Sequence, residues 1–136
     1  MKLINIKKAT PMFTGIITTC DRYTEEEATD GGVVNDAMLG RIKEIQTVIS
    51  PSEQCKARGI DQDDVLALSF EKYKKVRKSK NLDYGIDENY SNEYYYEMPV
   101  MPMDGRECLL IDISDVELKI DQFEWVDEPK EDLIVK

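Results

Sequence analysis

Short runs in which apolar and polar residues alternate predict a mostly β chain. Turn-forming residues separate these runs, and none shows the 3.6-residue repeat of a long amphipathic helix. Six or seven short strands with turns between them are typical of a small barrel or sandwich. The expected strands are residues 12–21, 39–50, 65–70, the segment from Tyr94, 100–103, 106–111 and 116–120.

Two turn signals lie near the end of the chain. The pair Asp104-Gly105 separates two extended segments, and such a pair favours a two-residue hairpin because its turn needs positive φ at both central positions. Val100–Met103 should therefore pair with Arg106–Ile111. Ser114 and Glu117 have the spacing of a capping box, which predicts one helical turn before the last strand.

Length and charge restrict the class of protein. The 136 residues, of which 41% are hydrophobic, suffice for one domain with one core. The net charge of −10 disfavours general binding to nucleic acid or to anionic membranes, because phosphates repel an acidic protein. We find no signal peptide and no apolar run of the ~20 residues that a membrane helix needs. The expected location is the cytoplasm, without secretion by a signal peptide.

Residue types that carry chemistry are scarce. The chain has no histidine, which excludes the usual Ser-His-Asp and Cys-His nucleophiles and imidazole-based metal sites. Cys20, Cys55 and Cys108 are odd in number and lack CxxC spacing, so they predict reduced thiols, with Cys20 and Cys108 inside strands. The pairs Asp63-Asp64 and Asp112 with Asp115 are of a kind expected by chance among 28 acidic residues. We therefore expect no enzymatic activity, no cofactor and no metal site.

The segment Lys72–Lys80 is the local exception to the acidic balance, with six basic residues in nine. It is compatible with a solvated edge strand, because lysines protect exposed edges from aggregation. It is also compatible with a contact for an acidic protein, including another copy of this chain, or for nucleic acid. Its candidate contact residues are Lys72, Lys74, Lys75, Arg77 and Lys78.

Aromatic and apolar residues near the end of the chain form two further candidates. Tyr94, Tyr95 and Tyr96 suit a protein interface, where tyrosine is enriched, and equally suit an ordinary sheet. The acidic segment 121–136 carries apolar residues that could anchor a partner or fold back on the domain. These residues are Trp125, Leu133, Ile134 and Val135.

A series of segments along the chain follows a familiar order: Thr10–Phe13 with Ile16–Tyr23, Gly31–Val34, Gly40–Ile49, Gly59–Leu68, Met103–Ile111 and Ser114–Val116. This order resembles the co-chaperonin (GroES-like) β-barrel family, in particular its phage and prophage versions. The resemblance covers about residues 10–120 and is strongest in Leu39–Phe70 and Met103–Ile120.

The resemblance implies a small GroES-like or OB-like β-barrel, a mobile loop that grips a chaperonin ring, and seven-fold rings. In that loop a Gly-Gly is followed by aliphatic residues, and Gly31, Gly32, Val33 and Val34 occupy the matching positions. The chain departs from the family at Gln62-Asp63-Asp64, which lacks the usual glycine, and at Ser50–Cys55, where a glycine-rich turn is replaced.

These observations lead to two functional hypotheses. The first is a non-enzymatic structural protein, a capsid-associated phage virion accessory on a co-chaperonin-like barrel, with residues 1–9 and 121–136 as arms and 71–98 as an extension of the 10–120 domain. On this hypothesis the protein is located first in the host cytoplasm and then in the virion. The second is a co-chaperonin that caps a chaperonin ring. The expected partners are capsid or virion proteins or a chaperonin ring, with self-association as a further option. The region Gly31–Met38, including Met38, joins the basic, tyrosine and tail residues as a candidate contact.

Overall fold

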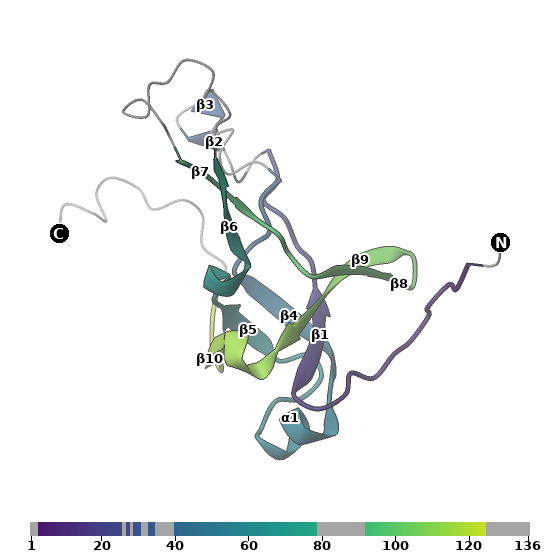
Figure 1. Ribbon diagram of the computed structural model, residues 1–136. Helices are drawn as coiled ribbons and strands as arrows, with labels where there is room; N and C mark the ends of the chain where they lie inside the picture. The colour runs from purple at the N-terminus through teal and green to yellow at the C-terminus, as the bar shows by residue number, and fades with distance from the viewer. Residues whose placement is uncertain are drawn as a thin grey trace.

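The computed structural model describes residues 3–25, 27, 29–30, 33–34, 40–78 and 92–124 (Figure 1). Its strands are β1 (Gly15–Thr19), β2 (Thr29–Asp30), β3 (Val33–Val34), β4 (Ile45–Pro51), β5 (Val65–Leu68), β6 (Lys74–Lys78), β7 (Asn92–Tyr96), β8 (Val100–Met103), β9 (Arg106–Asp112) and β10 (Val116–Ile120). The short helices are α1 (Glu53–Ala57) and the 3₁₀ turns Glu71–Tyr73 and Ile113–Asp115. Among these described residues, no helix is long and apolar enough to cross a membrane.

Most strands belong to one antiparallel sheet with the order β10-β5-β4-β1-β9-β8. The predicted mostly β class is confirmed. A closed barrel would require the two outermost strands to pair. In the described part of the chain β10 and β8 instead form opposite edges, so the sheet is open. Two small ribbons, β2–β3 and β6–β7, are separate from it and are drawn beyond the same end of the sheet (Figure 1).

The main core lies on the inner face of the sheet. Ile16, Val48, Leu66 and Leu109 are buried there from four different strands. Helix α1 closes one end of this core with the buried Cys55, and the Ser52 side chain caps the helix by accepting a hydrogen bond from the Cys55 backbone N–H. Sequence pattern indicated only a replaced turn in this segment, because five helical residues are too few to show a helical period.

The outer face of the same strands is also covered near β1. Ile17, Met103 and Cys108 form a second buried cluster, and Ile6 and Ala9 of the N-terminal segment pack against it. Ile16 and Ile17 thus enter different clusters, because successive side chains of a strand point to opposite faces of the sheet. The expected start at residue 12 was wrong, because the backbone turns before β1, with Phe13 at φ 56° and the Gly15 N–H donating to the Met12 carbonyl.

The predicted hairpin is confirmed. β8 pairs with β9, and the turn residues Asp104 and Gly105 have φ values of 53° and 76°. The left-handed region at both positions is what a type I′ turn requires, and glycine enters it without steric cost. The hairpin places Met103 and Cys108 on the outer face, where the N-terminal segment covers them.

The predicted capping box was placed two residues too late. Asp112 rather than Ser114 caps the turn. The Asp115 carboxylate, rather than that of Glu117, accepts the second hydrogen bond from the backbone N–H of the capping residue Asp112. An aspartate accepts such bonds as well as serine does, so the spacing alone did not identify the right pair. The helical turn and the closing strand β10 are present as expected.

The cysteines are free thiols. Cys108 lies in β9 as expected, whereas Cys20 follows the last residue of β1 and is not inside a strand. Cys20 packs against the inner cluster and Cys108 belongs to the outer one. The sheet therefore lies between these two thiols. The strands expected at 39–50 and 65–70 are shorter in the structure, beginning at Ile45 and ending at Leu68.

Candidate functional site

The β6–β7 ribbon carries the basic run and the tyrosines side by side. The two strands pair antiparallel, with Val76 opposite Tyr94 and Lys74 opposite Tyr96. Tyr94, Tyr95 and Tyr96 are 58%, 40% and 38% exposed, and Val76 is 50% exposed. A two-stranded ribbon has little core of its own, so the exposed parts of these side chains can contact another molecule.

A groove of about 400 Å³ separates the ribbon from the body of the protein. The isolated pairing of Arg22 with Ile42 forms one side, because it brings two distant segments together. The ribbon forms the opposite side. The lining residues are Arg22, Arg41, Ile42, Phe70, Tyr94, Tyr95, Tyr96 and Met98. We call this the arginine–tyrosine groove.

Cations stack on the tyrosine rings in and beside the groove. The Arg41 guanidinium carbon lies 5.6 Å from the centre of the Tyr96 ring, and the Lys74 amino group lies 4.4 Å from that of Tyr94. Contacts of this type are worth ~0.5–1 kcal/mol at exposed sites and more when water is excluded. Within the described ranges Arg41 makes no ion pair with a carboxylate, whereas Arg22 pairs with Glu107 at 3.2 Å.

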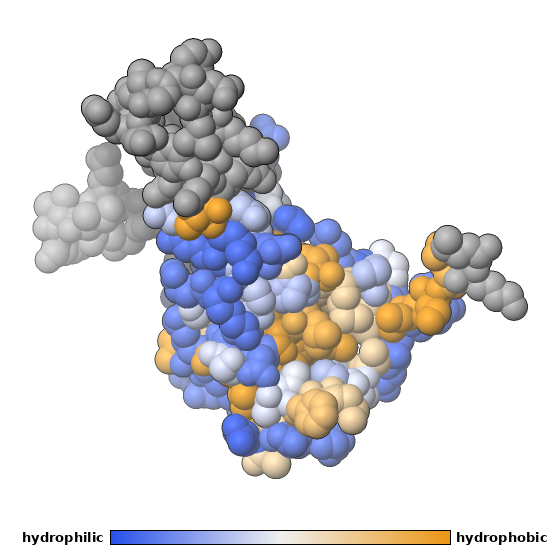
Figure 2. Space-filling view, viewed as in Figure 1, coloured by the Kyte–Doolittle hydropathy of each residue, from blue (hydrophilic) through white to orange (hydrophobic). Residues whose placement is uncertain are grey.

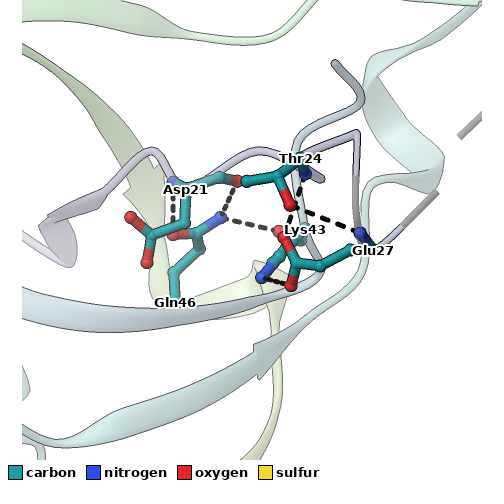
Figure 3. Close-up of polar contacts among 5 residues, drawn as sticks. All are labelled: Asp21, Thr24, Glu27, Lys43 and Gln46. Atoms are coloured by element: carbon teal, nitrogen blue, oxygen red, sulfur yellow. Dashed lines mark hydrogen bonds and ion pairs between the residues drawn. The ribbon is translucent and has the colours of Figure 1, made fainter. Parts of the chain in front are cut away.

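A buried glutamine fixes the base of the segment that carries β2 and β3 (Figure 3). Gln46 is 1% exposed, and its side-chain oxygen accepts from the Thr19 hydroxyl at 2.7 Å and from the Asp21 N–H at 2.9 Å. Its amide group donates to the carbonyls of Asp21 at 3.0 Å and Lys43 at 2.8 Å. The side chain thereby joins the chain leaving β1 to the chain entering β4.

An ion pair continues this network outward (Figure 3). Lys43 donates to a Glu27 carboxylate oxygen, and the other carboxylate oxygen accepts from the Thr24 backbone N–H. The hydrogen bond from Lys43, followed by that from Thr24, lowers the pKa of Glu27 to about 2. The carboxylate is therefore charged throughout the neutral range, and it closes the loop before β2.

The carboxylate pair Asp112 and Asp115 is engaged in local structure. Asp115 is 3% exposed and accepts from the Tyr73 hydroxyl at 2.6 Å, while Lys72 lies 3.0 Å from its other oxygen. Burial, and then the bond to Asp115, raises the pKa of Tyr73. Thr14 donates to Asp112, and this bond is the main reason that the pKa of Asp112 falls to about 2. Lys72 and Tyr73 thus help to hold the 3₁₀ turn Glu71–Tyr73, which precedes β6, against the turn Ile113–Asp115.

The structure brings together part of the predicted contact set. Tyr94, Tyr95 and Tyr96 line the groove, and Lys74 and Lys75 lie on the adjoining strand. Arg77 and Lys78 lie in strand β6, and Val33 and Val34 form strand β3. The predicted residues outside the described part are Gly31, Gly32, Met38, Trp125, Leu133, Ile134 and Val135.

The other side of the groove was not predicted from the sequence. Arg22, Arg41, Phe70 and Met98 come from four separate segments, and no local pattern connects them. The tyrosine triplet was the only available signal. In the part of the chain that the structure describes, no group of three or more Cys, Asp or Glu residues is arranged to hold a metal ion. What the groove can offer chemically is aromatic faces, guanidinium donors and an apolar floor.

Comparisons with protein-family models, with curated proteins and with solved structures find no match.

Proposed function

We propose that this protein is a non-enzymatic protein-binding component, an accessory of a phage particle, that contacts its partner through the arginine–tyrosine groove. The observation that carries the proposal is the row of exposed tyrosines on β7 facing Arg22 and Arg41 across that groove. Tyrosine and arginine are enriched in protein interfaces and often dominate their binding energy. The groove presents the tyrosines on a strand ribbon that stands apart from the sheet, and the arginines on the body opposite that ribbon.

The particle assignment rests on the resemblance to phage-encoded co-chaperonin barrels together with the departures from that family. The extension 71–98, which contains the ribbon, has no counterpart in the resemblance. A new contact surface added to a co-chaperonin-like domain supports a role in an assembly other than chaperonin capping. Fold alone does not determine function, so the added surface carries more weight than the resemblance.

Incorporation into particles tests this proposal. Particles are purified from cells that produce the phage or prophage encoding this chain, and the chain is detected with an antibody. We expect the wild-type protein in the particles and a variant with Tyr94→Ala and Tyr96→Ala in the free fraction. The matched control is Val76→Ala, an exposed residue of the same ribbon that does not line the groove. Absence of the wild-type chain from the particles overturns the proposal.

A second candidate function is that of a co-chaperonin, and the pairing of β2 with β3 favours it. Asp30 lies opposite Val33 in this small ribbon, so Gly31 and Gly32 connect its two strands. The Gln46 and Glu27 contacts fix the base of the segment that carries it. A loop of this kind suits the insertion of aliphatic residues into a partner's groove.

Co-fractionation with a purified chaperonin ring in the presence of ATP tests the co-chaperonin candidate. We expect Val33→Asp with Val34→Asp to abolish the association, while Val76→Asp leaves it unchanged. If the wild-type chain never binds the ring, or if the double variant still binds, this candidate is lost. The outcome is independent of the particle experiment, because the two assays use different surfaces and different partners.

A further inference from the structure

One row of apolar side chains crosses the outer face of the sheet on the β10 side. Leu118 of β10 lies opposite Ala67 of β5, and Ala67 lies opposite Ile45 of β4. Residues directly opposite in antiparallel strands place their side chains on the same face. Leu118 is 62% exposed and Ile45 is 45% exposed. We call Ile45, Ala67 and Leu118 the apolar row.

The apolar row continues a surface that is already covered elsewhere. Ile49 lies on the same face of β4 as Ile45, four residues on, and it packs against the cluster that Ile6 and Ala9 cover. On the β1–β9–β8 side, therefore, the N-terminal segment shields this face from water. Within the described ranges, nothing shields the row on the β10 side to the same degree.

Acidic residues border the apolar row. A hollow of about 420 Å³ adjoins it, and Ile45 and Ala67 line this hollow together with Glu44, Glu71 and Glu117. In the described part of the chain these three glutamates form no ion pair. An apolar surface with an acidic border is complementary to an apolar segment flanked by cations.

The N-terminal segment has that composition. Leu3 and Ile4 are 85% and 88% exposed, and Lys7 and Lys8 follow them on the surface. The segment projects from the body, and apolar atoms gather along it (Figure 2). Burial of each of these two large apolar side chains against another surface would contribute about 1.5–3 kcal/mol.

The segment does not reach the apolar row of its own chain. The Asp104 N–H donates to the Ile6 carbonyl at 2.7 Å, which holds Ile6 beside the β8–β9 turn. The nearest strand of the row, β4, is three strand spacings of ~4.8 Å from β8, or about 14 Å along the sheet, and β10 is five spacings away, or about 24 Å. The three residues from Ile6 to Leu3 span about 10 Å at most. The N-terminal end and β10 accordingly lie on opposite sides of Figure 1.

We propose that Leu3 and Ile4 of one copy dock on the apolar row of a second copy, with Lys7 and Lys8 near the acidic border. This contact is independent of the arginine–tyrosine groove and goes beyond the proposed function. It joins two different surfaces of the same chain, so it is heterologous. Repetition of such a contact produces a ring if the rotation between copies closes and a filament if it does not.

Sedimentation velocity with complementary variants tests this contact. Ile4→Glu places a charge in the docking segment and leaves the apolar row intact. Leu118→Glu places a charge in the apolar row and leaves the docking segment intact. Both residues are exposed, so neither change disturbs the core. We expect the wild-type chain to form oligomers whose size increases with concentration, and each variant alone to remain monomeric. The control Val76→Glu changes another exposed apolar residue, outside both proposed contact surfaces, and should behave as wild type.

Mixing the two variants gives the decisive result. The intact segment of the Leu118→Glu copy can dock on the intact row of the Ile4→Glu copy, so an equimolar mixture should form dimers and nothing larger. Circular dichroism checks that each variant is folded. A wild-type chain that is monomeric at high micromolar concentration overturns the proposal, as does a mixture that stays monomeric. Neither result bears on particle incorporation through the groove, which the tyrosine variants test separately.

Discussion

Replacing Gln46 by methionine measures how strongly the buried amide holds the base of the β2–β3 segment. Methionine has a similar length and no group that can replace the four hydrogen bonds of the side chain. Each such bond contributes ~1 kcal/mol net, and a buried group left without its partner costs ~1–3 kcal/mol. The adjoining backbone groups can regain water in part, so we expect a loss of about 3–4 kcal/mol in the free energy of unfolding.

Urea unfolding followed by circular dichroism measures this loss. Gln62→Met is the matched control, because Gln62 is exposed and its replacement should change the free energy by less than ~0.5 kcal/mol. A loss for Gln46→Met no larger than that of the control would refute the argument that the amide anchors this segment.

The charged variant Gln46→Glu gives an independent check of the donor bonds. A carboxylate in this position would face the carbonyls of Asp21 and Lys43 without a proton to donate. Burial and these carbonyls should raise the pKa of the new group above its unfolded value. The variant should therefore be least stable at neutral pH and recover part of its stability as the pH falls below that pKa. Equal destabilisation relative to wild type at all pH values would contradict the hydrogen-bond assignment.

Three further predictions concern the sheet and its end turn. The pKa of Asp112 is lowered from 3.8 to about 2, so the contribution of this carboxylate to stability is full above pH about 4 and is lost as the pH falls through about 2. In urea unfolding at a series of pH values, the free energy of unfolding of Asp112→Asn should therefore fall less over this range than that of the wild type. Gly15→Ala would place a Cβ atom 2.9 Å from that of Pro11 and should cost ~1–3 kcal/mol, read as a lower Tm. Tyr73→Phe removes the 2.6 Å bond to Asp115 and should cost ~1.5–3 kcal/mol in urea unfolding.

The sequence predicted elements best where a short-range pattern determines them. The Asp104-Gly105 hairpin depends on the φ angles of two adjacent residues, and it was placed correctly. The register of the capping box was wrong, because serine and aspartate are both good caps and two overlapping pairs fit the same spacing. Helix α1 was missed since five residues are too few to show a helical period.

Long-range features were beyond the reach of the sequence. Gln46 is a polar residue in a strand, and nothing local indicates that its amide is buried against two distant backbone segments. The same is true of Arg41, which meets Tyr96 only because the ribbon folds back along the body. The tyrosine half of the arginine–tyrosine groove was predicted from composition, and the arginine half required the fold.

The position of β1 in the sheet has a consequence for synthesis of the chain. β1 pairs with β9 in a register that places Ile17 opposite Leu110. A ribosome adds ~5–20 residues per second, so Ile17 is made roughly 5–20 s before its pairing partner. During that interval Ile16 and Ile17, both fully buried in the finished protein, have no strand on one side. We expect this stretch of the nascent chain to be the segment most exposed to capture by chaperones or to aggregation on crowded ribosomes.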